Sequence, residues 1–250
     1  LFLDLNKRRA DALIASGITR MMFVDYVWPY WGGRWGYGPA SMAAYRSALK
    51  GGDGGILLRL KDGERRFSFW DYFGLYADGP WEPERLGLDT WDAYTPVTER
   101  QAWTADEDAR RNMFLLVTLQ HYRWLKFLDD IGAHYSAQGG KLWVIPNPED
   151  LANASDYVVL GKMAHVRGNM PEWFGNPLWT DPLYRSGLYL ASAYHDAGNL
   201  LGPVLETNAG GHGRPYHDPE VAFAAAYDIF ASIQADVMKN DFLDEATIEH

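Results

Sequence analysis

The chain has 250 residues, and 23 Lys and Arg against 33 Asp and Glu give it a formal net charge of −10. This acidic balance argues against a nucleic-acid partner, because phosphate binding needs a basic surface. The absence of cysteine excludes disulfides, catalytic thiolates and zinc–thiolate or iron–sulfur centres. No apolar run is long enough to span a membrane, so we expect no membrane partner.

The N-terminal half of the chain carries mixed helix and strand signals. Apolar periodicity and breakers predict a helix over 4–16, a strand over 18–25 and a helix over 40–49. Asp62-Gly63 separates two apolar runs and predicts a β-hairpin within 56–70, because this dipeptide favours tight hairpin turns. A long aromatic loop follows to residue 104, so the hairpin and loop form an insertion near 55–104. The pattern of residues 105–137 predicts either one long helix or two helices separated by a break.

The C-terminal half alternates more regularly between strand and helix. Strands are predicted at 141–147, 163–170, 202–208 and 235–241, with helices after Pro148 and over 182–198 and 218–234. Such alternation predicts an α/β fold with a mostly parallel sheet. No glycine-rich nucleotide motif follows a strand, which favours a TIM-type (β/α) barrel over an open sheet. Since only about five of eight strands are evident, we expect an incomplete or irregular barrel, forming one catalytic domain over 1–250 or part of a longer chain.

Aromatic residues make up 15% of the chain, and many stand in stretches without periodicity. Trp and Tyr combine a flat apolar face with a polar group. With acidic residues between them, they favour a ligand that has apolar faces and many hydroxyls, such as a sugar, although packing is the alternative for any single ring. The rings predicted to bind substrate are Trp28, Trp31, Trp35 and Trp173. Others of this kind are Trp70, Tyr72, Tyr76, Trp81 and Trp91.

Two glutamates stand at or just past the ends of predicted strands. Glu206 lies between an apolar strand and a Gly-rich loop, and Glu172 precedes Trp173. A carboxyl against an indole in a partly dry pocket has a raised pKa and can act as a general acid. An ionised second carboxylate can act as nucleophile or base, and glycoside hydrolysis uses such a pair. We therefore predict Glu206 and Glu172 as catalytic, with solvated surface glutamates as the alternative.

Other polar residues near strand ends are predicted to bind substrate. They are Asp25, Asn147, Asn208 and Asp241, with turn or capping roles as the alternative. His212 and Arg214 belong to the segment GGHGRPYHDPE, whose glycines let the backbone approach a ligand closely. His212 and His217 have the composition of a metal site, but their spacing matches no standard motif. We predict no cofactor, and a metal-dependent hydrolase or lyase using these histidines is kept as an alternative.

Four segments together resemble a glycoside-hydrolase-type (β/α) barrel enzyme, without pointing to one numbered family. They are FVDYVWPYWGG, KLWVIPNPED, MPEWFG and VLETNAGGHGRP, within 18–35 and 140–241. In such enzymes one Glu donates a proton and another acts as nucleophile, and the resemblance implies these roles for Glu172 and Glu206. The expected function is a carbohydrate-active hydrolase acting on an oligo- or polysaccharide. A non-catalytic carbohydrate-binding module is the second hypothesis. Oligomeric state and compartment stay open, with a secreted or periplasmic location among the options.

Overall fold

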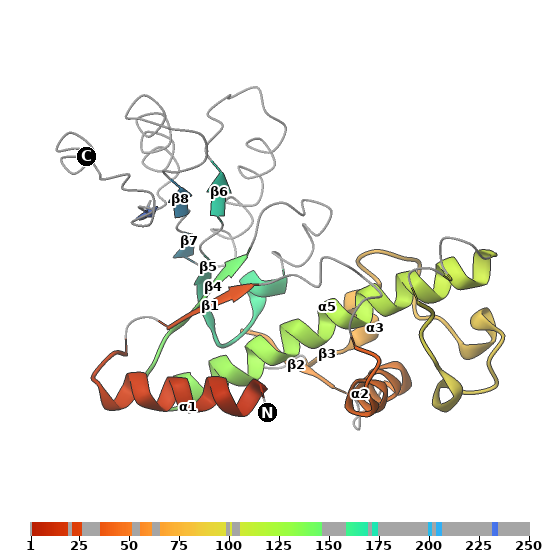
Figure 1. Cartoon of the computed structure of the whole chain (residues 1–250), viewed down its shortest axis with the longest axis horizontal. Helices are drawn as coiled ribbons and strands as arrows, with labels where there is room; N and C mark the ends of the chain where they lie inside the picture. Colours follow the sequence, from red (N-terminus) through yellow and green to blue (C-terminus); the bar gives the residue numbers. More distant parts are fainter. Residues whose placement is uncertain are drawn as a thin grey trace. The chain divides into compact units, whose positions relative to one another are not determined.

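The computed structural model divides into two compact units, and Figure 1 labels its helices and strands. It describes residues 2–19, 22–26, 36–51, 56–61, 66–98, 101, 106–146, 159–169, 172–174, 200–201, 204–206 and 232–234. Unit 1 comprises Leu1–Asn6, Val27–Ala133 and Met163–His165, and unit 2 comprises Lys7–Tyr26, His134–Lys162 and Val166–His250. The prediction of one catalytic domain over the whole chain stays a prediction.

Helices dominate the regular structure of unit 1. Its elements are the first turn of α1 (Phe2–Ala15), α2 (Pro39–Lys50), β2 (Leu58–Arg59), β3 (Arg66–Phe67), α3 (Phe69–Phe73), the 3-10 helices η1 (Pro83–Leu86) and η2 (Trp91–Ala93), and most of α5 (Glu107–Ser136). α5 is one unbroken helix of 30 residues and the longest in Figure 1, so the alternative of a broken pair is excluded. Glu107 and Asp108 lie in its first turn, where carboxylates stabilise the positive end of the helix dipole.

The segment predicted as a hairpin and a long aromatic loop near 55–104 contains α3, η1 and η2, and many of its rings are buried. α3 begins with a capping box, in which Ser68 Oγ accepts from Asp71 N at 3.2 Å and Asp71 Oδ2 accepts from Ser68 N at 2.9 Å. Phe69 lies edge-on to Tyr122 of α5, with ring centroids 5.7 Å apart. Phe73 meets Phe114 in the same way at 5.6 Å. Burying a ring of this size contributes about 1.5–3 kcal/mol, so packing explains these aromatics.

β2 and β3 pair antiparallel, with Leu58 opposite Phe67, at the position where the sequence predicts a hairpin. The turn at Asp62-Gly63 lies outside the described residues. The fully buried Tyr122 anchors both strands to α5, because its hydroxyl lies within hydrogen-bonding distance of the Phe67 and Ile56 carbonyls.

A buried carboxylate of α5 forms ion pairs with a residue of β2. Asp129 is fully buried, and Arg59 Nε from β2 donates to both of its carboxylate oxygens at 3.0 Å. Lys126 Nζ donates to Asp129 Oδ2 at 3.1 Å and also pairs with Asp130, as Arg59 does. Two cations thus compensate Asp129, as a buried charge requires.

Residues 163–165 contact the segment around β2 and α5. Met163 forms an isolated bridge with Leu60, and Ala164 N donates to Arg59 O at 2.8 Å. His165 then lies directly against Gly132 of α5, where a Cβ on the glycine would be only 2.7 Å from the His165 carbonyl oxygen. Glycine at this position therefore permits the close contact between α5 and the returning segment.

Unit 2 contains short parallel strands. β1 (Met22–Tyr26), β4 (Leu142–Pro146), β5 (Val166–Asn169) and β7 (Leu200–Leu201) form one sheet in the order β1-β4-β5-β7. Met22, Leu142 and Val166 occupy paired positions on three of these strands, and all three are buried. A second parallel sheet, in the order β6-β8-β9, contains β6 (Glu172–Phe174), β8 (Val204–Glu206) and β9 (Ser232–Gln234).

The last turn of α5 packs on α1 within unit 2. Tyr135 Oη donates to the Ile18 carbonyl at 2.7 Å, and Asp11 Oδ1 accepts from Gln138 Nε2 at 2.8 Å. His134 Nε2 lies 2.7 Å from the same oxygen. Hydrogen bonds from Gln138 and then His134 lower the pKa of Asp11 below its usual value. These contacts join two helices that are 117 or more residues apart in sequence.

The predicted α/β fold with a TIM-type (β/α) barrel is wrong. Helix is the main regular structure of the described residues, and the strands are only two to five residues long. These strands belong to three separate sheets, none of which closes into a ring within the described ranges. Between β1 and β4 the chain forms the helical and aromatic core of unit 1, where a barrel needs a crossover helix. Short apolar runs correctly predicted several strands, but such runs do not determine which strands pair or whether the sheet closes.

Two smaller predictions also change. The helix expected over 218–234 is wrong at its C-terminal end, because Ser232–Gln234 forms β9 and pairs in parallel with β8. β6 and β7 were not predicted as strands. The strand expected at 235–241 and the helix expected at 182–198 lie outside the described residues.

Candidate functional site

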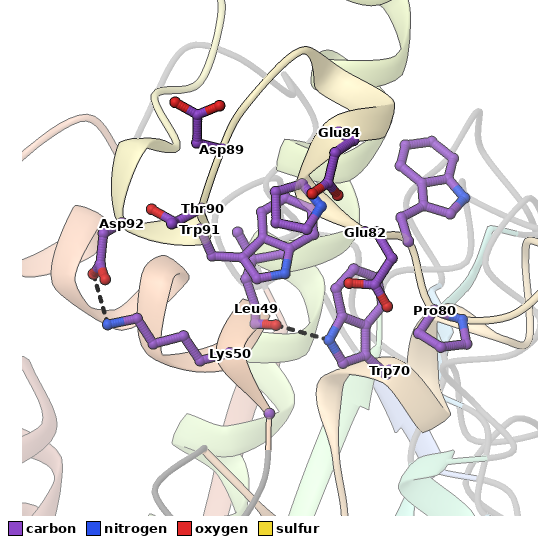
Figure 2. Close-up of a pocket in the computed structure, with 13 residues that line it drawn as sticks. Leu49, Lys50, Trp70, Pro80, Glu82, Glu84, Asp89, Thr90, Trp91 and Asp92 are labelled. Carbon is purple, nitrogen blue, oxygen red and sulfur yellow. Dashed lines mark hydrogen bonds and ion pairs between the residues drawn. The ribbon is translucent and has the colours of Figure 1, made fainter.

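Unit 1 contains a cavity of about 670 Å³, which we call the tryptophan–carboxylate pocket (Figure 2). Its walls come from the C-terminal end of α2, from α3, and from the segment 80–92 that includes η1 and η2. α2 ends at Gly51, whose φ of +62° is unfavourable for residues with a Cβ. A Cβ on Gly51 would also touch the Trp70 ring at 3.5 Å. A residue with a side chain would therefore be strained at this position, where α2 ends at the edge of the pocket.

Three indoles line the pocket. Trp70 Nε1 donates to the Leu49 carbonyl at 2.8 Å, which fixes α3 to the end of α2 (Figure 2). The Trp70 and Trp91 rings are 5.7 Å apart at an interplanar angle of 41°. Trp91 is 8% exposed and Trp81 is 7% exposed, so each is held by packing. The pocket therefore has a rigid aromatic wall.

Trp81 differs from Trp70 and Trp91 in the environment of its indole nitrogen. Its indole Nε1–H is buried and has no hydrogen-bond acceptor in the described part of the chain. One face of the ring carries the Arg85 guanidinium, with Cζ 4.5 Å from the ring centroid, and the ring edge meets Phe73. Buried donors are rarely left without a partner, and this nitrogen is buried inside unit 1 rather than open to the pocket.

The charged residues of the pocket are unbalanced. Four carboxylates and one ammonium line it: Glu82, Glu84, Asp89, Asp92 and Lys50. Lys50 Nζ pairs with Asp92 at 2.6 Å. The other three carboxylates are exposed and form no ion pair or hydrogen bond within the described ranges. Three of the four pocket carboxylates therefore lack an ion-pair partner in the described ranges, and Figure 2 labels them together with Trp70 and Trp91 among the lining residues.

A wall of indoles with carboxylates around it has a definite binding chemistry. Indole faces stack on apolar ring faces and attract cations. Carboxylates accept hydrogen bonds from hydroxyl and ammonium groups but cannot donate them. The pocket is therefore suited to a ligand that has an apolar face and several donors.

The two predicted catalytic glutamates lie in the same small sheet of unit 2. β6 pairs with β8 in parallel, with Glu172 opposite Val204 and Phe174 opposite Glu206. Glu172 and Glu206 are thus two register positions apart on neighbouring strands, which corresponds to roughly 8 Å between their Cα atoms. Trp173 lies next to Glu172 on β6, opposite Leu205.

Apart from Trp173, the one other predicted site residue that the structure describes is Asp25, which lies in a different sheet from this pair. Asp25 lies on β1, opposite Ile145 of β4, and so belongs to the other parallel sheet. The remainder lie outside the described residues: Trp28, Trp31, Trp35, Asn147, Asn208, His212, Arg214, His217 and Asp241. Among the residues that the structure describes, no group of three His, Asp or Glu is placed to hold a metal ion.

Sequence reasoning grouped Trp70, Trp81 and Trp91 with the sugar-type aromatics but did not assign them to a site. It missed Lys50 and the pocket carboxylates entirely. The available signal was local, because each tryptophan of 80–92 is followed by an acidic residue, as in Trp81-Glu82 and Trp91-Asp92. Nothing in the sequence showed that this segment lies against the end of α2.

Comparison with known proteins found no matching family model, no similar curated protein and no similar solved structure. In the described part of the chain, no helix is both long and apolar enough to cross a membrane. The residues of the pocket and of the β6–β8 pair are therefore the basis for assigning a function.

Proposed function

We propose that the protein is a carbohydrate-active hydrolase whose carboxylate pair is Glu172 and Glu206. The observation that carries this proposal is the parallel register of β6 and β8, which brings residues 34 positions apart in sequence onto neighbouring strands. Glycosidases hold their two carboxyl groups roughly 5–10 Å apart. A backbone separation of roughly 8 Å is compatible with that range.

The two glutamates have different roles in this proposal. Glu172 is assigned the role of general acid, the role that the resemblance to glycoside hydrolases implies for one glutamate of the pair. It gives its proton to the glycosidic oxygen as the bond from this oxygen to the anomeric carbon breaks. Glu206 is the second carboxylate, which either attacks the anomeric carbon or removes a proton from the attacking water. Water supplies the hydroxyl of the new reducing end.

The tryptophan–carboxylate pocket supports a carbohydrate ligand independently of the glutamate pair. Trp70, which is half-buried, offers aromatic surface for stacking on a sugar ring, and the pocket carboxylates accept hydrogen bonds from hydroxyls. The same pocket favours a second candidate function, a carbohydrate-binding module without catalysis, because binding by stacking needs no acid–base pair.

The test measures reducing-sugar release by the full chain from a panel of soluble polysaccharides. We expect Glu172→Gln and Glu206→Gln each to lower the rate by about 10²–10⁴-fold, because each removes one acid–base or nucleophilic group. Glycan binding, followed by affinity electrophoresis, is expected to survive in both variants.

Glu107→Gln is the matched control, since this glutamate lies in the exposed first turn of α5. We expect it to behave as the unsubstituted protein. Full turnover in both glutamate variants would contradict the proposed pair. Glycan binding without release of reducing sugar from any polysaccharide would favour the binding module.

A further inference from the structure

We propose that Gln234 is a positioning residue that keeps Glu206, the second carboxylate of the proposed hydrolase, ionised. This inference rests on the proposed function for the two glutamate roles, and it adds a residue on a third strand that distinguishes them. Its basis is the parallel register of β8 and β9, in which Gln234 is directly opposite Glu206. Residues opposite each other on neighbouring strands are roughly 5 Å apart.

The sheet β6-β8-β9 has two faces of different composition. Successive residues of a strand belong to opposite faces, and residues paired in register belong to the same face. One face therefore contains the hydrophobic residues Trp173, Leu205 and Ile233. The other face contains all the polar residues of these three strands and two hydrophobic ones, namely Glu172, Phe174, Val204, Glu206, Ser232 and Gln234. The two glutamates thus share the polar face.

The two glutamates have different neighbours on that face. The residue opposite Glu172 is Val204, a residue type whose side chain forms no hydrogen bonds. The residues opposite Glu206 are Phe174 on one side and Gln234 on the other. Within these three strands, an amide residue is therefore paired in register with Glu206 and not with Glu172.

A glutamine at this register position suits a carboxylate that must stay ionised. Its amide group has two N–H donors, and hydrogen bonds to an ionised carboxyl favour that form over the protonated one. The other titratable residue of the three strands is Glu172, so they place a negative charge and no positive one near Glu206. An amide donor opposite Glu206 offsets the repulsion between the two carboxylates.

The register therefore supports different roles for the two glutamates. A glycosidase needs one protonated and one ionised carboxyl group, and the surroundings of the two groups produce this difference. A hydrophobic neighbour favours the protonated carboxyl of a general acid, which agrees with Glu172 opposite Val204. An amide neighbour favours the ionised carboxylate of a nucleophile or base, which agrees with Glu206 opposite Gln234.

The first test measures the pKa of Glu206 by carboxyl-carbon NMR of the full chain with isotope-labelled glutamate, and Glu206→Gln identifies its signal. Gln234→Met keeps the side-chain length but removes the donors, so the Glu206 pKa should rise by about 0.5–1. Gln234→Glu keeps nearly the native shape and adds a like charge, so the rise should be larger. An unchanged Glu206 pKa in these variants would overturn the inference, and Gln234→Glu alone decides if Gln234→Met does not fold.

Ser232→Ala is the matched control, because Ser232 lies on the same strand and face as Gln234 but opposite Val204. We expect it to leave the Glu206 pKa unchanged, and thermal unfolding checks that each variant is folded. A rise in Ser232→Ala equal to that in Gln234→Met would show a general effect of β9 and would overturn the specific role of Gln234.

The pH profile of kcat/KM for reducing-sugar release then connects Gln234 with catalysis. Its acidic limb reports the ionisation of the base or nucleophile in the free enzyme. In Gln234→Met this limb should move to higher pH by about 0.5–1, because Glu206 then ionises at higher pH. A lower rate without movement of the acidic limb would show a merely structural effect and would overturn the inference.

The outcome for the proposed hydrolase is separate, because the NMR measurement does not depend on turnover. Cleavage of a polysaccharide together with an unchanged Glu206 pKa in both Gln234 variants would leave the hydrolase standing and overturn this inference. The expected pKa rises without cleavage of any polysaccharide would support the effect of Gln234 on Glu206 and overturn the hydrolase.

Discussion

Two regions of unit 1 differ in whether their polar groups have hydrogen-bond or ion-pair partners within the protein. Around β2 and α5, the buried Asp129 is bonded to Arg59 and Lys126, and the buried Tyr122 hydroxyl has two carbonyl partners. Around η1 and η2, polar groups stay unmatched in the described structure. These are the three carboxylates of the tryptophan–carboxylate pocket, Trp81 Nε1 and the hydroxyl of Tyr94, which follows η2.

This difference distinguishes polar groups that stabilise the fold from polar groups that are available to bind a ligand. Polar groups that find partners inside the protein stabilise the fold, because an unpaired buried group costs free energy. Exposed carboxylates beside a cavity can instead accept hydrogen bonds from a ligand. Substitutions in the first region should therefore lower stability, whereas substitutions in the second should mainly change binding.

The largest effect on stability is expected at Arg59. Arg59→Met leaves the fully buried Asp129 with Lys126 as its remaining cation, so the free energy of unfolding should fall by about 2–3 kcal/mol. Arg111→Met is the control, because Arg111 pairs with Glu107 and Asp108 on the surface of α5. Exposed pairs contribute about 0–1 kcal/mol. Urea unfolding measures both, and equal losses would remove the distinction between the two regions.

Two buried tyrosines give the next prediction. Tyr122→Phe removes a hydroxyl that serves the Ile56 and Phe67 carbonyls, so we expect a loss of about 1–2 kcal/mol. Tyr94→Phe removes a buried hydroxyl that has no partner, and stability should change by less than about 0.5 kcal/mol or rise slightly. Burial raises the pKa of both phenols. A larger loss of unfolding free energy in Tyr94→Phe than in Tyr122→Phe would contradict the difference between the two regions.

The smallest expected effect is a pH dependence at His165. Burial, and then the charge of Arg59, lower the pKa of this imidazole, while Asp129 opposes them. As the pH falls through the unfolded value of about 6.5, the unfolded state therefore takes up the proton first and the folded state loses stability. Stability from this group is complete above that pH and declines below it.

His165→Gln should therefore flatten the profile of unfolding free energy between about pH 7 and pH 5. In Arg59→Met, the His165 pKa should rise, because a cation near the ring is removed while Asp129 stays. An NMR titration of the ring protons measures this directly. An unchanged His165 pKa in Arg59→Met would show that the ion-pair network does not act on this histidine.

Elements with strong local signals were predicted well. The helices at 4–16 and 40–49 match α1 and α2 closely, because apolar periodicity is followed by Gly17 or Gly51. The strands near 18–25 and 141–147 match β1 and β4, which are apolar runs bounded by breakers. Their assembly into a barrel was wrong, since pairing depends on distant residues that local patterns do not contain.

The site was predicted less well than the helices. α3 is five residues long and is stabilised by a capping box and ring contacts with α5, so it has too little periodicity to detect. The pocket brings together Lys50, Trp70 and the segment 80–92 through tertiary packing. Its carboxylates resemble ordinary surface residues in sequence. For the predicted glutamates, the backbone register of β6 and β8 is known, and their catalytic roles stay a prediction.

The contact between Gly132 and His165 sets a limit on how this chain can vary. An alanine at 132 would strengthen α5 by about 1 kcal/mol in helix propensity, yet its methyl group would collide with the His165 backbone. Glycine at this position therefore reflects the close contact between α5 and the segment that contains His165, which local sequence patterns do not predict. In any set of sequences descended from a common ancestor with this chain, an unvarying glycine in the last turns of this helix would indicate the same close contact.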